Sequence, residues 1–197
     1  KGDCFDRVWE GILEAERVGF EPIKINVVPS KGSNDNEIVD FAKLTLTKPF
    51  QVRFIEFMPV DDWDGWKKSF ISKAEMMEKI ETALGKLEPV INEKDRSGPA
   101  KNYRLHGAPG VVGFISAISE HFCDTCNRIR LGADGRIKQC LFSESYMDFR
   151  TPLRNGCEDA EIERLLCSVM ETKPEAHNID INAESQKFLH SMTQIGG

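Results

Sequence analysis

The first third of the chain alternates between two hydrophobic patterns. Apolar side chains recur at helical spacing through residues 3–19, and Gly19 suits the end of that helix. Short apolar runs at about 22–29 and 51–58 predict strands, and residues 38–44 between them have helical spacing. This alternation is typical of βα units with a parallel sheet, in which ligands bind at the carboxyl ends of the strands.

The middle of the chain combines one well-marked helix with two stretches that lack a clear period. Residues 59–70 and 85–101 are interpreted as irregular connections because they are rich in residues that break regular structure. Between them, Ser72 and Glu75 have the spacing of a capping box, and apolar positions at helical spacing follow. We therefore expect a helix that begins just after Ser72.

The remainder of the chain is predicted to form a second domain. The run 111–115 indicates a strand, Asp134-Gly135 a hairpin turn, and residues 158–170 a further helix. We therefore assign the βα units to residues 1–70 and an α+β domain to residues 71–197.

Composition excludes several classes of protein. The 197 residues are 40% hydrophobic and 29% charged, which is typical of a folded globular chain. No run approaches the roughly 18 apolar residues of a membrane-spanning helix, so we expect no membrane partner. A formal net charge of −6 argues against general nucleic-acid binding. Six unevenly clustered cysteines suggest a metal site in a reducing compartment, the cytoplasm, rather than a disulfide scaffold.

Three cysteines near the middle of the chain are the best candidates for metal ligands. Cys123, Cys126 and Cys140 have the spacing C-x2-C-x13-C. Three thiolates are one short of the usual four for zinc or a 4Fe–4S cluster, which would leave one iron open to a substrate. The spacing alone serves either metal equally, and a structural zinc site would take His121 or His106 as its fourth ligand.

Two further cysteines are interpreted as ordinary thiols. Cys167 falls on the apolar face of the predicted helix 158–170, where buried cysteine is common. Cys157 is an alternative fourth metal ligand.

Arg128 and Arg130 form a candidate anion site next to the cysteines. Residues two apart on a strand project to the same face, so we expect both guanidiniums there and Ile129 and Leu131 in the core. Each guanidinium can donate paired hydrogen bonds to oxygen atoms of a polyanion. The alternative is a solvated arginine pair on an edge strand.

Lys24 and Arg53 each interrupt an otherwise apolar predicted strand. A long cation beside buried residues is costly unless it is paired or faces a cavity. The alternatives are an ion pair with Glu56 or Asp40, and a side chain that reaches solvent.

Four segments of the chain carry a family resemblance, and they are spread along nearly its whole length. They are Lys24–Val28 with the loop after it, Arg53–Pro59, the cysteine motifs within residues 120–142, and the terminal Ile195–Gly197. In this order they resemble the fifth strand, the sixth strand, the C-terminal cluster motif and the double-glycine tail of the GTP 3′,8-cyclase family of molybdenum cofactor biosynthesis.

The resemblance implies a fold and an activity. The fold is α/β: residues 1–70 would be the C-terminal part of an incomplete (βα)6 radical S-adenosylmethionine, TIM-like barrel, followed by the α+β domain that binds a second 4Fe–4S cluster and GTP. The activity is that of a lyase, which converts GTP to (8S)-3′,8-cyclo-7,8-dihydroguanosine 5′-triphosphate by radical S-adenosylmethionine chemistry. This is the first step of molybdenum cofactor (molybdopterin) biosynthesis.

The same resemblance implies roles for individual residues. It assigns the 4Fe–4S cluster to Cys123, Cys126 and Cys140, GTP to Lys24, Arg53, Arg128, Ile129 and Arg130, S-adenosylmethionine to Asn26 and Met58, and a catalytic tail to Gly196 and Gly197.

One departure from the family pattern stands out. Its members open with a cysteine triplet, C-x3-C-x2-C, whereas Cys4 is the only cysteine before residue 100 here. We therefore expect a C-terminal fragment that is inactive alone. The intact protein would hold S-adenosylmethionine and a first 4Fe–4S cluster, and would form a homodimer in the cytoplasm.

Two other functions fit parts of the pattern. One is another radical S-adenosylmethionine enzyme with an auxiliary cluster, and the other is a non-catalytic zinc-binding module. Metal analysis of protein purified without oxygen separates the zinc module from the two enzymes. Binding of GTP separates the two enzymes from each other.

Overall fold

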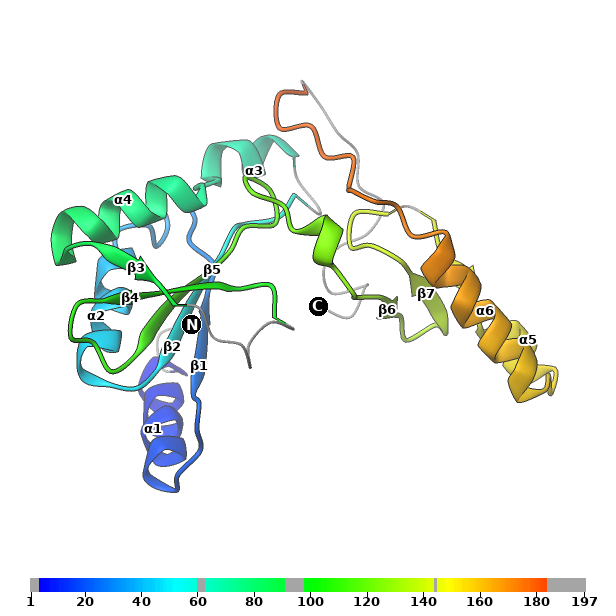
Figure 1. The fold of residues 1–197 in the computed structure, drawn as a ribbon, viewed down its shortest axis with the longest axis horizontal. Helices are drawn as coiled ribbons and strands as arrows, with labels where there is room; N and C mark the ends of the chain where they lie inside the picture. The colour runs from blue at the N-terminus through cyan, green and yellow to red at the C-terminus, as the bar shows by residue number, and fades with distance from the viewer. Residues whose placement is uncertain (1–3, 60–62, 91–97, 144, 184–197) are drawn as a thin grey trace. The chain divides into compact units, whose positions relative to one another are not determined.

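The chain folds into two compact units, each with both helices and strands. The computed structural model describes residues 4–59, 63–90, 98–143 and 145–183. The first unit comprises Lys1–Phe57 and Ser69–Glu120, and the second comprises Met58–Lys68 and His121–Gly197. The fold class is therefore mixed α/β in both units (Figure 1).

The first unit is built on a five-stranded mixed sheet with the strand order β1-β2-β5-β4-β3. The strands are β1 (Lys24–Val27), β2 (Gln51–Ile55), β3 (Leu87–Pro89), β4 (Lys101–Leu105) and β5 (Val111–Ile115). β1, β2 and β5 run parallel, whereas β4 and β3 are antiparallel to their neighbours. Helix α2 (Ile38–Thr47) joins β1 to β2, which confirms the βα unit that the hydrophobic pattern predicts.

The main core of the first unit lies on one face of this sheet, beneath α2 and α4 (Lys73–Leu84) (Figure 1). Val52 and Phe54 of β2 are fully buried in it, and the Phe54 ring stacks on Phe114 of β5 at 5.8 Å. Because side chains alternate along a strand, Arg53 emerges on the opposite face. Asn26 is its register partner on β1, so these two side chains share that face.

A buried carboxylate connects three segments of the first unit. Glu56, at the end of β2, is 1% exposed. It accepts hydrogen bonds from the backbone N–H groups of Lys73, Ile118 and Ser119, each at 2.9 Å, and from the Ser119 hydroxyl. The end of β2, the start of α4 and the segment after β5 are therefore held together by one charged group.

The side chain of Lys73 reinforces the same junction. Its stem is buried, and its ammonium lies 2.7 Å from the Glu120 carboxylate and 5.5 Å from the centre of the Tyr103 ring. The Lys73 ammonium lowers the pKa of Glu120, with a smaller contribution from Lys101 at 3.3 Å. Lys73 thus contributes to this junction twice: its backbone N–H donates to Glu56, which also binds Ile118 and Ser119, and its ammonium pairs with Glu120.

The second unit has a smaller sheet and a smaller core. Its antiparallel strands are β6 (Arg130–Leu131), β7 (Arg136–Lys138) and β8 (Met147–Asp148). Its helices are α5 (Arg150–Arg154), α6 (Asp159–Glu171) and most of α3 (Trp63–Ser69). A 3-10 turn, η2 (Cys123–Thr125), precedes β6. Ile137, Phe149 and Val169 form one buried apolar cluster, and Trp66 of α3 is buried as well. The short strands leave much of this unit to be held by loops and polar contacts.

The periodic elements agree with the predictions, and the irregular stretches do not. α1 (Cys4–Arg17), the capping box of α4, strand β5, the turn before β7 and α6 are all confirmed. The stretch 59–70 contains α3, and 85–101 contains β3 and the start of β4. The units also differ from the expected division into residues 1–70 and 71–197, because β3, β4 and β5 extend the sheet of β1 and β2.

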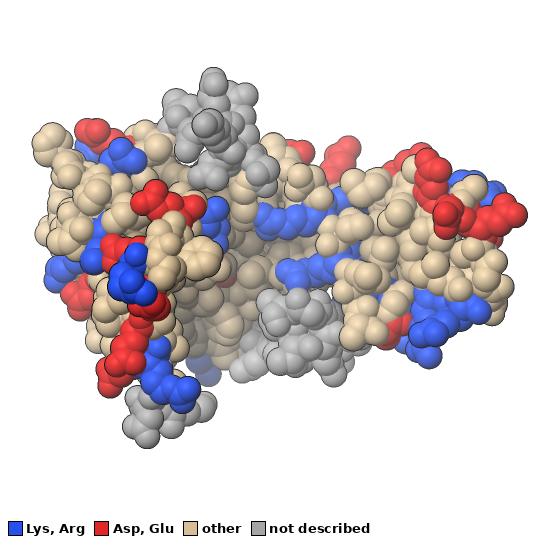
Figure 2. All heavy atoms as spheres, turned by 90° about the horizontal axis from the view of Figure 1, so that it is seen from below, with Lys and Arg blue, Asp and Glu red and all other residues tan. Residues whose placement is uncertain are grey.

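The surface carries charges of both signs. Figure 2 shows acidic and basic side chains next to one another on the drawn face. Several of them form exposed ion pairs, among them Lys43 with Asp40 and Arg17 with Glu14. Among the described residues, no helix combines the length and the apolar character needed to cross a membrane.

The capping box of α4 gives stability a defined dependence on pH. The Lys31 ammonium, 2.7 Å from Glu75 Oε1, lowers the pKa of Glu75 to about 2 from its usual 4.5, and hydrogen bonds from Ser72 act in the same direction. Because this pKa is lower in the folded than in the unfolded state, ionised Glu75 stabilises the fold above its usual pKa. That contribution is lost as the pH falls toward 2.

We expect Glu75→Gln to lower the free energy of unfolding by about 0.2–1 kcal/mol at neutral pH, because the lost ion pair is half exposed. Glutamine still accepts the hydrogen bond from the Ser72 N–H, so the capping box remains. Urea denaturation should show the difference from wild type shrinking as the pH falls below the usual pKa of glutamate. Glu78→Gln, at an exposed position of the same helix, is the control, and equal effects of both variants at every pH would contradict the assignment.

Candidate functional site

The first two candidate metal ligands lie on one tight turn. Cys123 begins η2, and the N–H of Cys126 donates to the carbonyl of Cys123 at 3.1 Å. The Arg128 guanidinium lies 5.5 Å from the centre of the Phe122 ring, so a cation–π contact spans the turn. Cys140 lies two residues beyond the end of β7. All three cysteines are free thiols and partly buried.

Thiolates are ligands of both zinc ions and 4Fe–4S clusters, so the chemistry of this donor set suits either group. Zinc binds sulfur at about 2.3 Å, so its ligands must converge on one point. Within the described ranges, no three His, Cys, Asp or Glu side chains lie close enough to hold one ion. In a cluster each thiolate binds a different iron, which holds the sulfurs farther apart. His121, the proposed fourth zinc ligand, packs edge-to-face against His177 at 5.2 Å.

The arginine segment is arranged differently from the prediction. β6 contains only Arg130 and Leu131, and Arg128 precedes it as an exposed residue. The expectation that Ile129 and Leu131 lie in the core is wrong, since they are 37% and 66% exposed. β6 is an edge strand, and the apolar cluster forms around Ile137 on the central strand β7, so Leu131 of β6 lies outside it.

Cys157 and Cys167, the two thiols interpreted as ordinary, also lie outside the core. Cys167 is exposed on α6, whereas the predicted apolar face would bury it. The inward face of this helix carries Ile162, Leu165 and Val169. Cys167 lies two residues before Val169, and a step of two residues leads to the opposite side of a helix. Cys157 is partly buried, and this desolvation, together with the carboxylates of Glu161 and Asp159, raises the pKa of its thiol.

The first unit places three of the candidate residues on one face of its sheet. Arg53 Nε donates to Asn26 Oδ1 at 2.9 Å across β1 and β2. Lys24 lies two positions before Asn26 on the same strand, so it shares this face and is exposed. The Arg53 stem passes over Gly113 of β5, where a Cβ would lie 3.1 Å from Arg53 Cγ and 2.8 Å from Asn102 Oδ1.

The ion pairs with Glu56 or Asp40, considered above as an alternative for these two cations, do not form among the described residues. The Glu56 carboxylate accepts hydrogen bonds from the N–H groups of Lys73, Ile118 and Ser119 instead, and Asp40 pairs with Lys43 at 2.7 Å. Among the described residues, Arg53 is oriented by the amide oxygen of Asn26 and not by a carboxylate.

The other candidates are divided between the units. Met58 belongs to the second unit, as do the three cysteines and the arginine segment, and its side chain is partly buried. Gly196 and Gly197 lie outside the described residues. Sequence reasoning missed two contacts at this site, made by Lys173 and His177, because both side chains reach the cysteine segments from far along the chain.

The chain is thus a mixed α/β protein whose second unit carries the three free thiols and the two candidate arginines. Residues 50–179, more than half of the chain, match the family Molybdenum Cofactor Synthesis C. The chain belongs to this family.

Curated relatives agree with this assignment. The chain is 46% identical over 193 residues to the GTP 3′,8-cyclase of Thermodesulfovibrio yellowstonii, an alignment that covers 98% of the chain and 58% of that protein. It is 41% identical to the GTP 3′,8-cyclase of Pelotomaculum thermopropionicum, with 100% and 60% covered, and 44% identical to that of Alkaliphilus metalliredigens, with 100% and 59% covered. The chain thus spans less than two thirds of the length of these relatives.

The space over Gly113 gives a prediction about Arg53. We expect Gly113→Ala to destabilise the protein by about 1–3 kcal/mol, because the methyl group would press on the Arg53 stem and the Asn102 amide. Urea denaturation measures the change. Gly11→Ala is the matched control: a Cβ there meets nothing within 4 Å, and helix α1 should gain up to about 1 kcal/mol. A Gly113→Ala variant as stable as wild type would show that Arg53 does not occupy this space.

Proposed function

We propose that this chain is part of a GTP 3′,8-cyclase, which converts GTP to (8S)-3′,8-cyclo-7,8-dihydroguanosine 5′-triphosphate by radical S-adenosylmethionine chemistry, the first step of molybdenum cofactor biosynthesis. The observation that carries the proposal is 46% identity to a protein of that name over 98% of the chain. The parallel strands β1, β2 and β5 support the view that the first unit includes the end of an incomplete (βα)6 barrel.

In this proposal Cys123, Cys126 and Cys140 hold a second 4Fe–4S cluster. Such a cluster, bound by three thiolates, supplies one open iron that can bind the guanine of GTP. The turn at η2 sets the direction of the first two thiols, and partial burial limits the access of water to them. Three free thiols in this family motif support the assignment.

The basic residues bind GTP. Lys24 and Arg53 contact the triphosphate, and Arg128, Ile129 and Arg130 contact the nucleotide next to the cysteines. A guanidinium offers paired donors to phosphate oxygens, and Arg53 offers them from a fixed direction because Asn26 holds its Nε. The absence of a carboxylate partner for Arg53 among the described residues leaves its charge available to an anion.

Asn26 and Met58 contact S-adenosylmethionine, and the Gly196-Gly197 tail assists the radical chemistry. S-adenosylmethionine and a first 4Fe–4S cluster belong to the whole protein, which we propose to be a cytoplasmic homodimer. The Asn26 bond to Arg53 links a proposed S-adenosylmethionine contact to a proposed GTP contact on one sheet face.

Metal loading tests the cluster assignment. A full-length protein that contains this chain, reconstituted with iron and sulfide without oxygen, should carry about four irons at the second site. Cys123→Ser, Cys126→Ser and Cys140→Ser should each lose them, whereas Cys167→Ser, at an exposed thiol on α6, should retain them. Iron analysis and visible absorption measure the outcome, and stoichiometric zinc in place of iron would refute the cluster.

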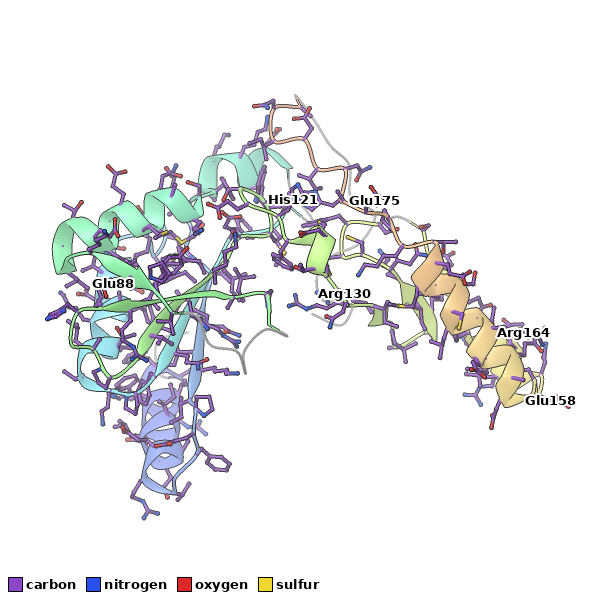
Figure 3. All side chains as sticks on the ribbon, in the orientation of Figure 1. Glu88, His121, Arg130, Glu158, Arg164 and Glu175 are labelled. Atoms are coloured by element: carbon purple, nitrogen blue, oxygen red, sulfur yellow. The ribbon has the colours of Figure 1, made fainter. Side chains whose placement is uncertain are left out.

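Nucleotide affinity tests the arginines. In the full-length protein, Arg128→Ala and Arg130→Ala should each weaken GTP binding by about 10- to 150-fold, because a charge-assisted hydrogen bond to a partly buried anion contributes roughly 1.5–3 kcal/mol. Lysine should restore only part of the affinity, since it lacks the planar fork. Calorimetry measures binding, and Arg164→Ala on α6 is the control (Figure 3). If both variants bind GTP with wild-type affinity, Arg128 and Arg130 are solvated surface residues that do not bind the nucleotide.

A further inference from the structure

The segment that follows α6 contacts the cysteine turn at several points. Figure 3 labels His121, just before the turn, and Glu175, in the segment after α6; the two segments run side by side. The ring of His177 packs edge-to-face against His121 at 5.2 Å and against Phe142 at 5.1 Å. This aromatic contact places residues 173–179 against both halves of the cysteine motif.

The most specific contact is made by Lys173. Its Nζ donates to the carbonyl oxygen of Cys126 at 2.5 Å and to that of Arg128 at 2.9 Å, and it lies 3.5 Å from Cys126 Sγ. An ammonium has three donors, and here three acceptors surround it: two backbone carbonyls and one sulfur. Lys173 is only partly exposed, so solvent competes weakly for these bonds.

The other half of the cysteine motif is tied to the same end of α6. Gln139, the neighbour of Cys140, donates from its side-chain amide to the carbonyl of Val169 at 2.9 Å and to the hydroxyl of Thr172. The C-terminal end of α6 therefore holds Cys126 from one side and the residue next to Cys140 from the other. None of these contacts is needed to complete the small apolar core of the second unit.

We propose that Lys173 is a positioning residue for the metal site, a role that rests on the proposed function of the three cysteines. It fixes the backbone of Cys126 and Arg128 with one ammonium, and it donates a hydrogen bond to the sulfur of Cys126. Residues that orient metal ligands in this way contribute to metal affinity, and hydrogen bonds to ligating sulfurs contribute to the reduction potential. A cationic donor stabilises the more negative, reduced state, so Lys173 raises the potential of the cluster.

The proposal also links the metal ligand to the arginine segment. Because one ammonium binds the carbonyls of both Cys126 and Arg128, the backbone between them is held in one conformation. Loss of Lys173 should therefore affect a thiolate and a guanidinium together, whereas loss of a purely structural contact would not change a reduction potential.

The test uses Lys173→Met in a full-length protein, because methionine retains much of the stem and removes all three donors. In the metal-free protein, amide hydrogen exchange of residues 123–131 should become at least about tenfold faster, since bonds to a charged donor are lost. In the reconstituted protein, the potential of the signal that Cys126→Ser abolishes should shift to a lower value. Lys86→Met, at an exposed lysine after α4, should change neither quantity.

Each result decides the proposal. Faster exchange with a lowered potential, partly restored by Lys173→Arg, supports it. Exchange at the wild-type rate overturns it, and an unchanged potential in a loaded Lys173→Met protein overturns the contact with sulfur. If wild type itself takes up no iron, the proposed function fails, while hydrogen exchange in the metal-free protein still decides whether Lys173 holds the turn. Circular dichroism identifies a variant that has failed to fold, and Lys173→Gln then replaces it in the exchange measurement.

Discussion

The buried carboxylate of Glu56 is the interaction on which the arrangement of the first unit depends. Removing a carboxylate from water is costly unless donors surround it, and here the donors come from the start of α4 and from Ile118 and Ser119. Each group left unsatisfied by separation of these segments would cost about 1–3 kcal/mol. The ion pair of Lys73 with Glu120 acts on the same junction, so the last residues of the first unit are fixed by charge as well as by packing.

The second unit depends on polar contacts even more, because its apolar core is small. Besides Trp66 of α3, its buried apolar residues within the described part of the chain are Ile137, Phe149 and Val169, which form one cluster. They pack β7 against the start of α5 and against α6, and no residue of the cysteine turn belongs to this cluster. That turn is instead held by hydrogen bonds from Lys173 and by the ring of His177. A hydrogen-bonded turn can be ordered without apolar burial, provided that its donors are charged and partly shielded from water.

The parts of the fold that could be predicted from sequence are those set by local periodicity. β2 was predictable because buried and outward positions alternate, and α4 because its capping box lies within one turn of the chain. β3 was missed because three residues with a proline give no period, and its pairing with β4 is decided by distant partners. Leu131 was misplaced for a similar reason: charged and apolar residues alternate from Arg128 to Leu131, but the position of the strand at a sheet edge is a property of the tertiary structure.

The candidate site also has features that local sequence predicts and features that depend on distant residues. Two-residue steps from Cys126 to Arg128 to Arg130 keep a thiol and two guanidiniums within a short distance of one another, whatever the fold, because covalent geometry limits the reach of the chain. The relative directions of these side chains could not be predicted from local sequence, because the backbone between them is held by Lys173, 45 positions from Arg128. No spacing rule identifies such a donor. Because one ammonium binds both carbonyls, the backbone conformations at Cys126 and at Arg128 are set together, and a ligand that contacts both residues would find them arranged before it binds.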